Sequence, residues 1–232
     1  MDSAQFEKQA GQRSQGYWLL SKLFLEPPTP LRLVELQEAL AGAGGAAEPV
    51  QADLDFLRNV VSEVLSDSTA TAAAVEYTRR FVAVPRDSHE PLPFESHVRE
   101  GCLPGEATER VRALAREWGF GEVAPESGSP DHLGAELRLM ALLCLDERMA
   151  WATGDRASAI ESLRRQSRFL ADHLLQWAPD YCAALAARAE NSYVQAIARI
   201  AASTLRADIE ALDEMTRQVD HPAEQPPATI PS

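Results

Sequence analysis

Asp131, His132 and Glu136 are the residues of this chain whose types and spacing could most directly do chemistry. A carboxylate can orient a histidine for general-base catalysis, and a glutamate four residues after a histidine shares its helix face. No nucleophile motif lies beside them, which argues against catalysis. A metal centre needs three or four ligands, and these residues with the distant His173 are too few. The remaining interpretations are a hydrogen-bonded group that anchors a loop, or part of a partner surface.

Aromatic residues form a second group. Tyr77 and Phe81 are four residues apart, so both rings lie on one face of a predicted helix. After a proline-rich gap, Phe94-Glu95-Ser96 fits a loop that turns into a short helix, with Glu95 near its start. Core packing and a structural turn are the simplest interpretations. The alternative is an aromatic groove for an apolar peptide, flanked by acids that suit basic residues.

Other candidate sites are weaker. His89, His97 and Cys102 match no zinc signature, and the three cysteines form neither a disulfide framework nor a metal motif. The glycine cluster at 42–45 lacks the Lys-Ser/Thr of a phosphate-binding loop. Phe169, His173 and Trp177 form a stripe at helical spacing, which predicts core packing. The sequence therefore predicts no metal, no cofactor and no catalytic residue.

Composition narrows the class of protein. The chain has 232 residues, 45% hydrophobic and 25% charged, and a net charge of −13. That charge argues against a nucleic-acid binder and is compatible with a basic peptide partner, although acidity also simply favours solubility. No apolar run reaches about 18 residues, and the N-terminus lacks the pattern of a secretory signal. We expect a cytoplasmic protein without membrane insertion.

Helical periodicity dominates the chain. Thr29-Pro30 predicts a helix start, Thr153-Gly154 a helix end and Asp155 the next start. Ser129-Pro130 predicts another start, and Trp177-Ala178-Pro179 predicts a break. No strand pair or repeat is visible. We predict an all-α, single-domain bundle of about nine helices over 1–218, with a long Pro-rich loop at 82–103 and a disordered Pro-rich tail at 219–232.

Several segments together resemble the TorD/DmsD family of molybdoenzyme maturation chaperones. They are the run Leu20-Ser21-Lys22-Leu23-Phe24 before Pro27-Pro28, the stretch Glu76-Tyr77-Thr78-Arg79-Arg80-Phe81, the segment Pro93-Phe94-Glu95-Ser96, and Pro130-Asp131-His132-Leu133-Gly134-Ala135-Glu136-Leu137. Each motif is short, but their order and spacing over about Tyr17 to Leu212 are fairly specific. Arg80 stands where an apolar residue is common in the family.

The resemblance implies a binding protein and not an enzyme. Its partner would be the twin-arginine signal peptide, the apoprotein, or both, of a molybdenum-cofactor oxidoreductase, held back from export until the cofactor is inserted. An alternative is an assembly chaperone for a nitrate-reductase-type subunit without an exported signal peptide. The resemblance places the peptide site at Tyr77, Phe81, Phe94, Glu95, Ser96, Asp131, His132 and Glu136. Relatives also form domain-swapped dimers, so a monomer and a dimer exchanged at 82–103 both stay open.

Overall fold

The most extensive packing between two helices in the described part of the chain joins α1 (Ser3–Leu25) to α7 (Leu133–Thr153). Near the start of α7, the hydroxyl of Ser21 donates to the carbonyl oxygen of Gly134 at 2.8 Å. A Cβ atom on Gly134 would lie 2.5 Å from Cγ of Leu25, so only glycine permits this approach. The contact fixes the start of α7, which carries the Asp131-His132 motif, against the end of α1.

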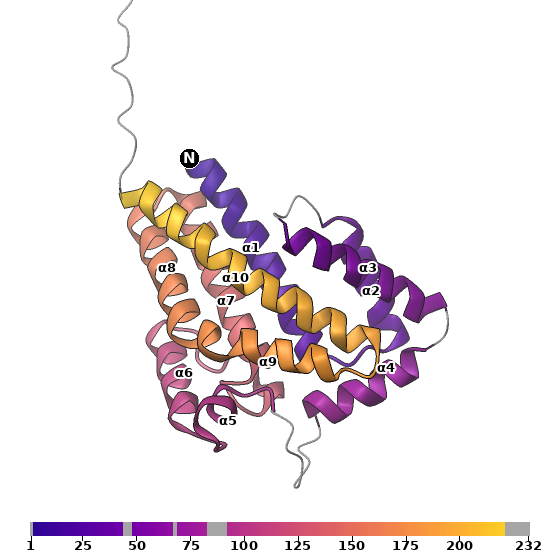
Figure 1. Ribbon diagram of the computed structural model, residues 1–232. Helices are drawn as coiled ribbons and strands as arrows, with labels where there is room; N and C mark the ends of the chain where they lie inside the picture. Colours follow the sequence, from indigo (N-terminus) through magenta and orange to yellow (C-terminus); the bar gives the residue numbers. More distant parts are fainter. Residues whose placement is uncertain (1, 44–47, 67–68, 83–91, 221–232) are drawn as a thin grey trace, which may run out of the picture.

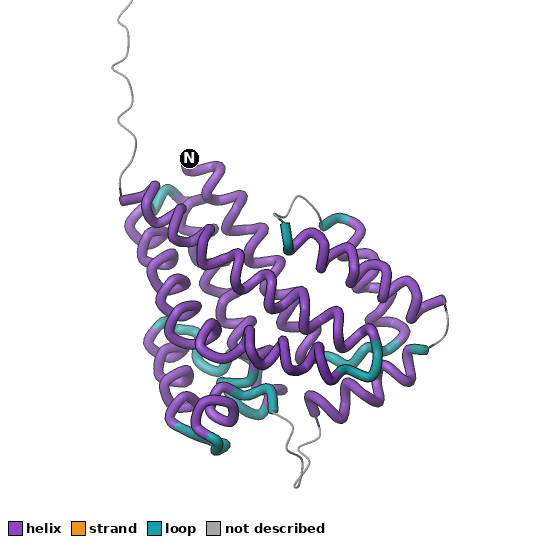
Figure 2. Tube along the Cα trace, in the orientation of Figure 1, coloured by secondary structure: helices purple, strands orange, loops and turns teal. Residues whose placement is uncertain are grey.

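This computed structural model describes residues 2–43, 48–66, 69–82 and 92–220 (Figures 1 and 2). Besides α1 and α7 they form α2 (Pro30–Ala41), α3 (Val50–Ser66), α4 (Ala70–Tyr77), η1 (Thr78–Val82), α5 (Glu95–Glu100), α6 (Glu106–Glu117), η2 (Pro125–Ser127), α8 (Arg156–Phe169), η3 (Leu170–Leu174), α9 (Leu175–Arg188) and α10 (Ser192–Asp220). Across these ranges there is no β-strand, only an isolated bridge between Phe94 and His132. The predicted all-α, single-domain class is confirmed.

Helix α10 is the long central element in Figure 1, with α2, α3 and α4 to one side and α5, α6 and α8 to the other. It packs against α9, α3 and α8. The first half of α7 is buried on nearly every side. The core includes the fully buried aromatic side chains of Tyr17, Phe24, Tyr77, Phe169 and Trp177. None of the helices that the structure describes is both long and apolar enough to cross a bilayer.

Local start and stop signals are confirmed. Thr29 and Asp155 cap α2 and α8, because each side chain accepts a hydrogen bond from a backbone N–H three residues later. Pro30 occupies the first turn of α2. Gly154 ends α7 at a φ of 75°, in the left-handed region that favours glycine.

Four expectations about helix boundaries are wrong. The break at Trp177–Pro179 does not occur, because α8, η3 and α9 run on without interruption from 156 to 188 and Pro179 is buried inside α9. Proline removes one hydrogen bond of the ladder, and the π-turn of η3 just before α9 already departs from the regular ladder. Tertiary packing outweighs the local cost.

Two further corrections concern the predicted site. Helix α7 starts at Leu133 with His132 as its N-cap, and not at Ser129-Pro130, which forms a preceding turn closed by a hydrogen bond from the amide of His132 to the carbonyl of Ser129. The segment 82–103 is not wholly irregular, since it contains α5. The predicted start of a short helix at Glu95 is confirmed. The predicted tail begins too early, because Val219 and Asp220 are the last residues of α10 and Val219 is buried. Residues 83–91 of the proposed exchange hinge and the remaining tail, 221–232, lie outside the described residues.

Candidate partner-binding site

Two backbone hydrogen bonds bring the Phe94-Glu95-Ser96 segment to the start of α7. The amide of Glu95 donates to the carbonyl of Asp131 at 2.9 Å, and the amide of Leu133 donates to the carbonyl of Pro93 at 2.8 Å. The rings of Phe94 and His132 meet edge to face with centroids 5.0 Å apart. Six of the eight predicted site residues therefore lie together: Phe94, Glu95, Ser96, Asp131, His132 and Glu136.

The carboxylate of Asp131 holds α5 in place. It accepts from the amide and the hydroxyl of Ser96, at 3.0 and 2.6 Å, and from the hydroxyl of Ser129. Thr108 of α6 extends this network by donating to the Ser96 hydroxyl at 3.3 Å. Asp131 and Ser96 are both fully buried. Asp131 thus caps α5 and anchors a loop, but it does so through Ser96 and Ser129 and not as a hydrogen-bonded pair with His132.

His132 caps α7 through its ring. Nδ1 accepts from the amide of Gly134 at 3.0 Å, which requires a neutral ring with its proton on Nε2. Burial lowers the pKa of His132 to about 4, although the charge of Asp131 acts in the opposite direction. The side chains of His132 and Glu136 turn to different partners, so they do not act as a pair.

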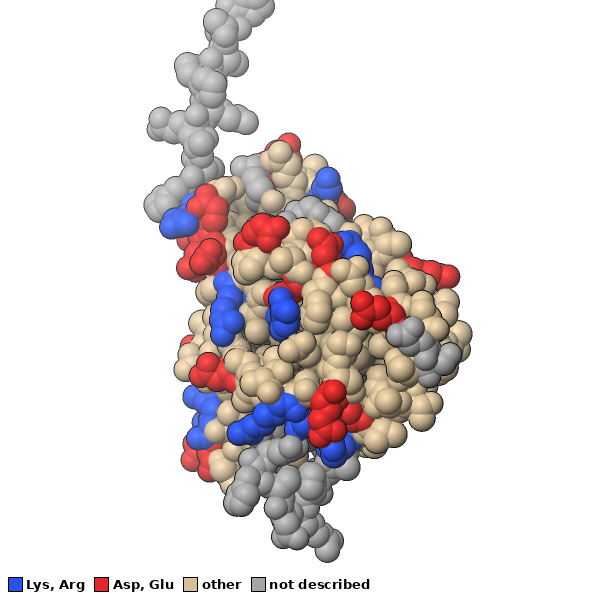
Figure 3. Space-filling model, turned by 45° about the vertical axis from the view of Figure 1, so that its right-hand side comes forward, with Lys and Arg blue, Asp and Glu red and all other residues tan. Residues whose placement is uncertain are grey.

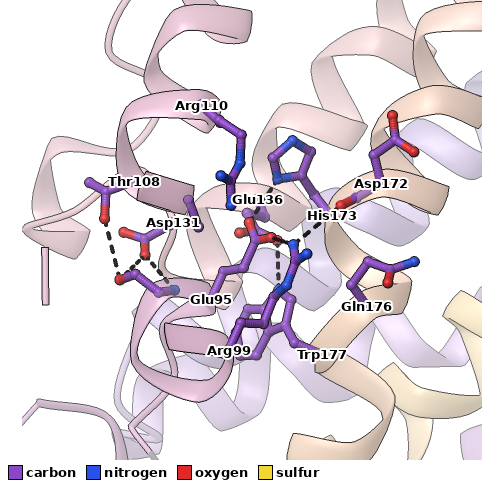
Figure 4. Close-up of polar contacts among 12 residues, drawn as sticks. Glu95, Arg99, Thr108, Arg110, Asp131, Glu136, Asp172, His173, Gln176 and Trp177 are labelled. Atoms are coloured by element: carbon purple, nitrogen blue, oxygen red, sulfur yellow. Dashed lines mark hydrogen bonds and ion pairs between the residues drawn. The ribbon is translucent and has the colours of Figure 1, made fainter. Parts of the chain in front are cut away.

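Glu95 is a fully buried carboxylate with two cationic or potentially cationic neighbours. His173 Nδ1 lies 2.7 Å from Oε2, and Nη1 of Arg99 donates to Oε1 (Figure 4). Burial alone would raise the pKa of Glu95, but the hydrogen bonds and charges of His173 and Arg99 lower it below its usual value. Glu95 therefore carries its negative charge inside the protein.

Glu136 lies beside Glu95 and has fewer donors. Its Oε2 accepts from the indole N–H of Trp177 at 3.2 Å, while no group in the described part of the chain donates to Oε1. Burial and then the charge of Glu95 raise the pKa of Glu136 well above its usual value. In its protonated form, Glu136 can donate to Glu95. We call Glu95, Asp131 and Glu136 the α5–α7 acid cluster.

Tyr77 and Phe81 belong to a different part of the core. They pack against each other with centroids 4.8 Å apart, and Phe81 meets Phe24 of α1 edge to face at 5.3 Å. Tyr77 is fully buried and Phe81 nearly so. Among the described residues, both rings are enclosed by the core and are not exposed in a groove. Arg80, the departure from the family pattern, donates to the carbonyl of Arg188 at 2.7 Å and ties η1 to the end of α9.

Sequence reasoning missed four side chains at the site: Arg99, Thr108, His173 and Trp177. His173 and Trp177 were interpreted as core residues, with His173 also weighed as a metal ligand, yet they bind Glu95 and Glu136. A signal was present, because a histidine inside an apolar stripe needs a polar partner when it is buried. Among the described residues, no three His, Cys, Asp or Glu side chains are arranged to hold a metal ion.

Comparison with known proteins decides the family. A sequence profile described as nitrate reductase delta subunit matches residues 43–183, more than half of the chain. The chain belongs to this family. The resemblance to TorD/DmsD chaperones is likewise confirmed, since curated relatives with the name TorD match over most of the chain. The matched range includes the α5–α7 acid cluster and all four side chains that sequence reasoning missed.

Three relatives of this TorD/DmsD-family chain illustrate the range of sequence identity and of coverage. Chaperone protein TorD of Vibrio cholerae is 24% identical over 89% of this chain and 94% of its own. Chaperone protein TorD of Shewanella loihica is 26% identical over 86% and 92%. A chlorate reductase assembly chaperone protein of Ideonella dechloratans is 41% identical over a shorter part, 28% of this chain and 33% of its own.

Proposed function

We propose that this chain is a cytoplasmic maturation chaperone for a molybdenum-cofactor oxidoreductase. It binds the twin-arginine signal peptide of the apoprotein, and also the apoprotein itself, and delays export until the cofactor is inserted. It acts by binding, without turnover. Its family membership and the chaperone names of its relatives support this function. The observation that carries the peptide site is the α5–α7 acid cluster, three carboxyl groups gathered at the junction of two helix starts.

The acid cluster differs from the exposed acids of this protein in how its charges are held. On the face seen in Figure 3, acidic and basic side chains are interspersed. Many exposed acids also pair with an arginine one turn away, as Glu35 does with Arg32 and Glu161 with Arg165. Glu95 differs, since it is fully buried and still bears a charge. A concealed carboxylate can select a guanidinium group more strongly than an exposed one.

Each predicted residue has a role in this proposal. Glu95 attracts the arginines of the peptide by its charge, Glu136 beside it offers an oxygen that can accept a further hydrogen bond, and Phe94 is the aromatic surface next to them. Ser96, Asp131 and His132 hold α5 and the start of α7 in position. Tyr77 and Phe81 are positioning residues, because they pack in the core next to α1 and do not face the acid cluster.

A second candidate is an assembly chaperone for a nitrate-reductase-type subunit that carries no exported signal peptide. The description of the matching family favours it. The two candidates differ in the partner segment that they require. An apoprotein whose N-terminal segment has been removed would still bind under this alternative, whereas under the leading proposal its affinity would fall.

The test is calorimetric titration with synthetic twin-arginine signal peptides from candidate molybdoenzymes. We expect binding at about micromolar Kd, roughly −8 kcal/mol, and at least about tenfold weaker binding when both arginines become glutamine. Glu95→Gln should weaken binding by about tenfold, since it keeps the shape and removes the charge. Glu161→Gln is the matched control, because it removes an equal charge from the exposed face of α8.

Equal affinity for the arginine and glutamine peptides would refute the proposed site. Glu95→Gln is preferable to replacing Asp131 and His132 together. Those two side chains cap α5 and α7, so their loss would change the local fold as well as the charge.

A further inference from the structure

Arg99 is the side chain that separates Glu95 from solvent. Its side chain is 31% exposed, whereas the side chain of Glu95, to which its Nη1 donates, is 0% exposed. The second neighbour of Glu95, His173, is itself buried at 5% side-chain exposure. Figure 4 shows Arg99 reaching Glu95 from α5, with His173 and Trp177 on the opposite helix. A partner group that approaches Glu95 from outside must therefore replace Arg99 first.

The acceptors around Arg99 form a site for one guanidinium group. Nη1 donates to Oε1 of Glu95 and also lies 3.4 Å from the carbonyl oxygen of Asp172. Asp172 belongs to the π-turn η3, where the regular pattern of backbone hydrogen bonds changes and carbonyl groups become available. One acceptor thus comes from α5 and the other from η3, so a single cation bridges two elements.

Arg99 uses this site incompletely. Within the described residues, its Nε and Nη2 bind no acceptor, so it does not hold Glu95 with the parallel pair of hydrogen bonds that arginine can form with a carboxylate. Arg13 shows the complete arrangement elsewhere in this molecule, with two bonds of 2.7 and 2.8 Å to Asp208. An incoming guanidinium group with free orientation could pair better than Arg99 does.

A second acid lies next to the same site. The side chain of Asp172 is 65% exposed, and the only cation that pairs with its carboxylate among the described residues is Arg168, at 3.8 Å and 61% exposed. An ion pair this long and this exposed contributes little. Glu95 and Asp172 together could therefore receive two neighbouring arginines, one at the concealed carboxylate and one at the exposed carboxylate.

We propose that Arg99 is an internal competitor that occupies the guanidinium site of the α5–α7 acid cluster until an arginine of the partner peptide displaces it. This inference rests on the proposed function. Arg99 would set the affinity, and the two-acceptor site would set a preference for arginine over lysine, because lysine is a point charge without the planar set of donors. A purely structural helix pair between residues 95 and 99 would have neither effect.

The experiment compares Arg99→Gln with Arg110→Gln. Arg110 lies on neighbouring α6 and pairs with Glu100 and Glu106, so its loss changes the net charge equally without uncovering Glu95. Each full-length variant is titrated with the same synthetic peptide, two consecutive arginines followed by an apolar stretch of about 15 residues. Arg99→Gln should bind about tenfold more tightly than wild type, and Arg110→Gln within about twofold.

Two further arms keep the test decisive. Arg99→Lys keeps the charge and the fold if Arg99→Gln is unstable, and its affinity should lie between those of wild type and Arg99→Gln. With a peptide in which lysines replace both arginines, the increase in affinity of Arg99→Gln over wild type should fall to about threefold or less. Thermal unfolding of each variant verifies that it is folded before titration.

The outcomes separate the two proposals. Tighter binding by Arg99→Gln alone supports the competitor, and so does binding by Arg99→Gln when wild type does not bind. If wild type, Arg99→Gln and Arg110→Gln bind alike, the competitor is overturned and the proposed function stands. If none of them binds the peptide, both the proposed function and the competitor are wrong.

Discussion

Among the buried charges of the described residues, two groups differ in how completely their charges are paired. The first is the α5–α7 acid cluster. The second, which we call the α1–α10 ion network, consists of Arg13, Tyr17, Glu147 and Asp208, and it links α1 and α7 to α10 in the core. In the network, Asp208 accepts two bonds from Arg13 and one from the hydroxyl of Tyr17 at 2.7 Å.

Glu147 completes the network without an orphan atom. Its carboxylate accepts from the indole of Trp151 at 3.1 Å and from the amide of Gln166 at 3.0 Å, and it lies 3.4 Å from Arg13. The side chains of Arg13 and Asp208 are only 12% and 8% exposed. No group of this network can be replaced from outside without opening the core.

The acid cluster has the opposite properties. Glu136 has an oxygen that no described group serves, and Glu95 is held by a half-exposed arginine. The ion network is therefore suited to fixing the positions of helices, and the acid cluster to exchanging one partner for another. Burial of charge alone does not mark a binding site; incomplete pairing next to solvent is the better indication.

The largest expected effect tests the structural role of the ion network. Asp208→Ala leaves Arg13 buried with only the more distant Glu147, so the free energy of unfolding should fall by about 3–5 kcal/mol. Urea unfolding followed by circular dichroism measures this loss. Without urea, as long as the variant is folded, its affinity for the signal peptide should equal that of wild type.

A paired variant isolates the cause. Arg13→Met combined with Asp208→Leu should recover at least half of the stability lost in Asp208→Ala, because no guanidinium group is then buried without its carboxylate, and Glu147 keeps its bonds from Trp151 and Gln166. A loss below about 1 kcal/mol in Asp208→Ala would mean that the network contributes little, and the contrast with the acid cluster would fail.

The second effect is a dependence of the protein's stability on pH, which arises at His132 next to the acid cluster. The pKa of His132 is about 4 in the folded protein against 6.5 in an ordinary setting. The folded state thus binds the proton more weakly than the unfolded state does. The contribution of His132 to the free energy of unfolding is therefore fully present above pH 6.5 and is lost as the pH falls toward 4. The loss should amount to about 3 kcal/mol, since protonation of Nδ1 also breaks the cap to Gly134.

His132→Asn is the variant that tests this, because asparagine can cap a helix and does not titrate. The difference in unfolding free energy between wild type and His132→Asn should change by about 3 kcal/mol between pH 7 and pH 4. Taking the difference removes the opposing effect of Glu136, whose raised pKa favours the folded state as the pH falls. His97→Asn, on α5, controls for loss of an imidazole. A constant difference across this range would contradict the N-cap assignment.

The sequence predicted what depends on neighbouring residues. Helix ends at Thr29, Gly154 and Asp155 follow from side chains that cap their own turns. The pairing of Arg13 with Asp208 could not be predicted, because 195 residues separate them and either side chain alone suggests a solvated surface charge. The predicted helix break at Pro179 was wrong for the same reason. The hydrogen bond that proline removes is visible in the local sequence, but the packing that buries Pro179 involves residues far along the chain.

The candidate site was predicted in part. The motifs named Glu95, Asp131 and Glu136, and a backbone bridge between residues far apart in sequence brings them together. Their state could not be predicted from the motifs, because it depends on Arg99, His173 and Trp177. A histidine in an apolar stripe indicates that it has a polar partner, but the pattern does not tell which carboxylate that partner is. The groove expected around Tyr77 shows a second limit. Helical spacing places two rings on one face but does not tell whether other elements cover that face.

The smallest effect concerns Thr108, which links α6 to the acid cluster. Its hydroxyl accepts from the amide of Gly105 at 3.2 Å and donates to the Ser96 hydroxyl at 3.3 Å, and the side chain is fully buried. Thr108→Val keeps the volume but leaves that amide without its acceptor, so unfolding should cost about 1–2 kcal/mol less. The amide of Ser96, bonded to Asp131, should also exchange its hydrogen faster, because α5 loses part of its support.

Thr153→Val is the matched control for this variant, since the hydroxyl of Thr153 is exposed at the end of α7 and donates only to carbonyls of its own helix. Its stability should stay within about 0.5 kcal/mol of wild type. Urea unfolding and hydrogen exchange of both variants give the comparison. If the Ser96 amide is as well protected in Thr108→Val as in wild type, α5 is held rigidly without this link, and Arg99, which belongs to α5, would not be free to yield its place to a peptide.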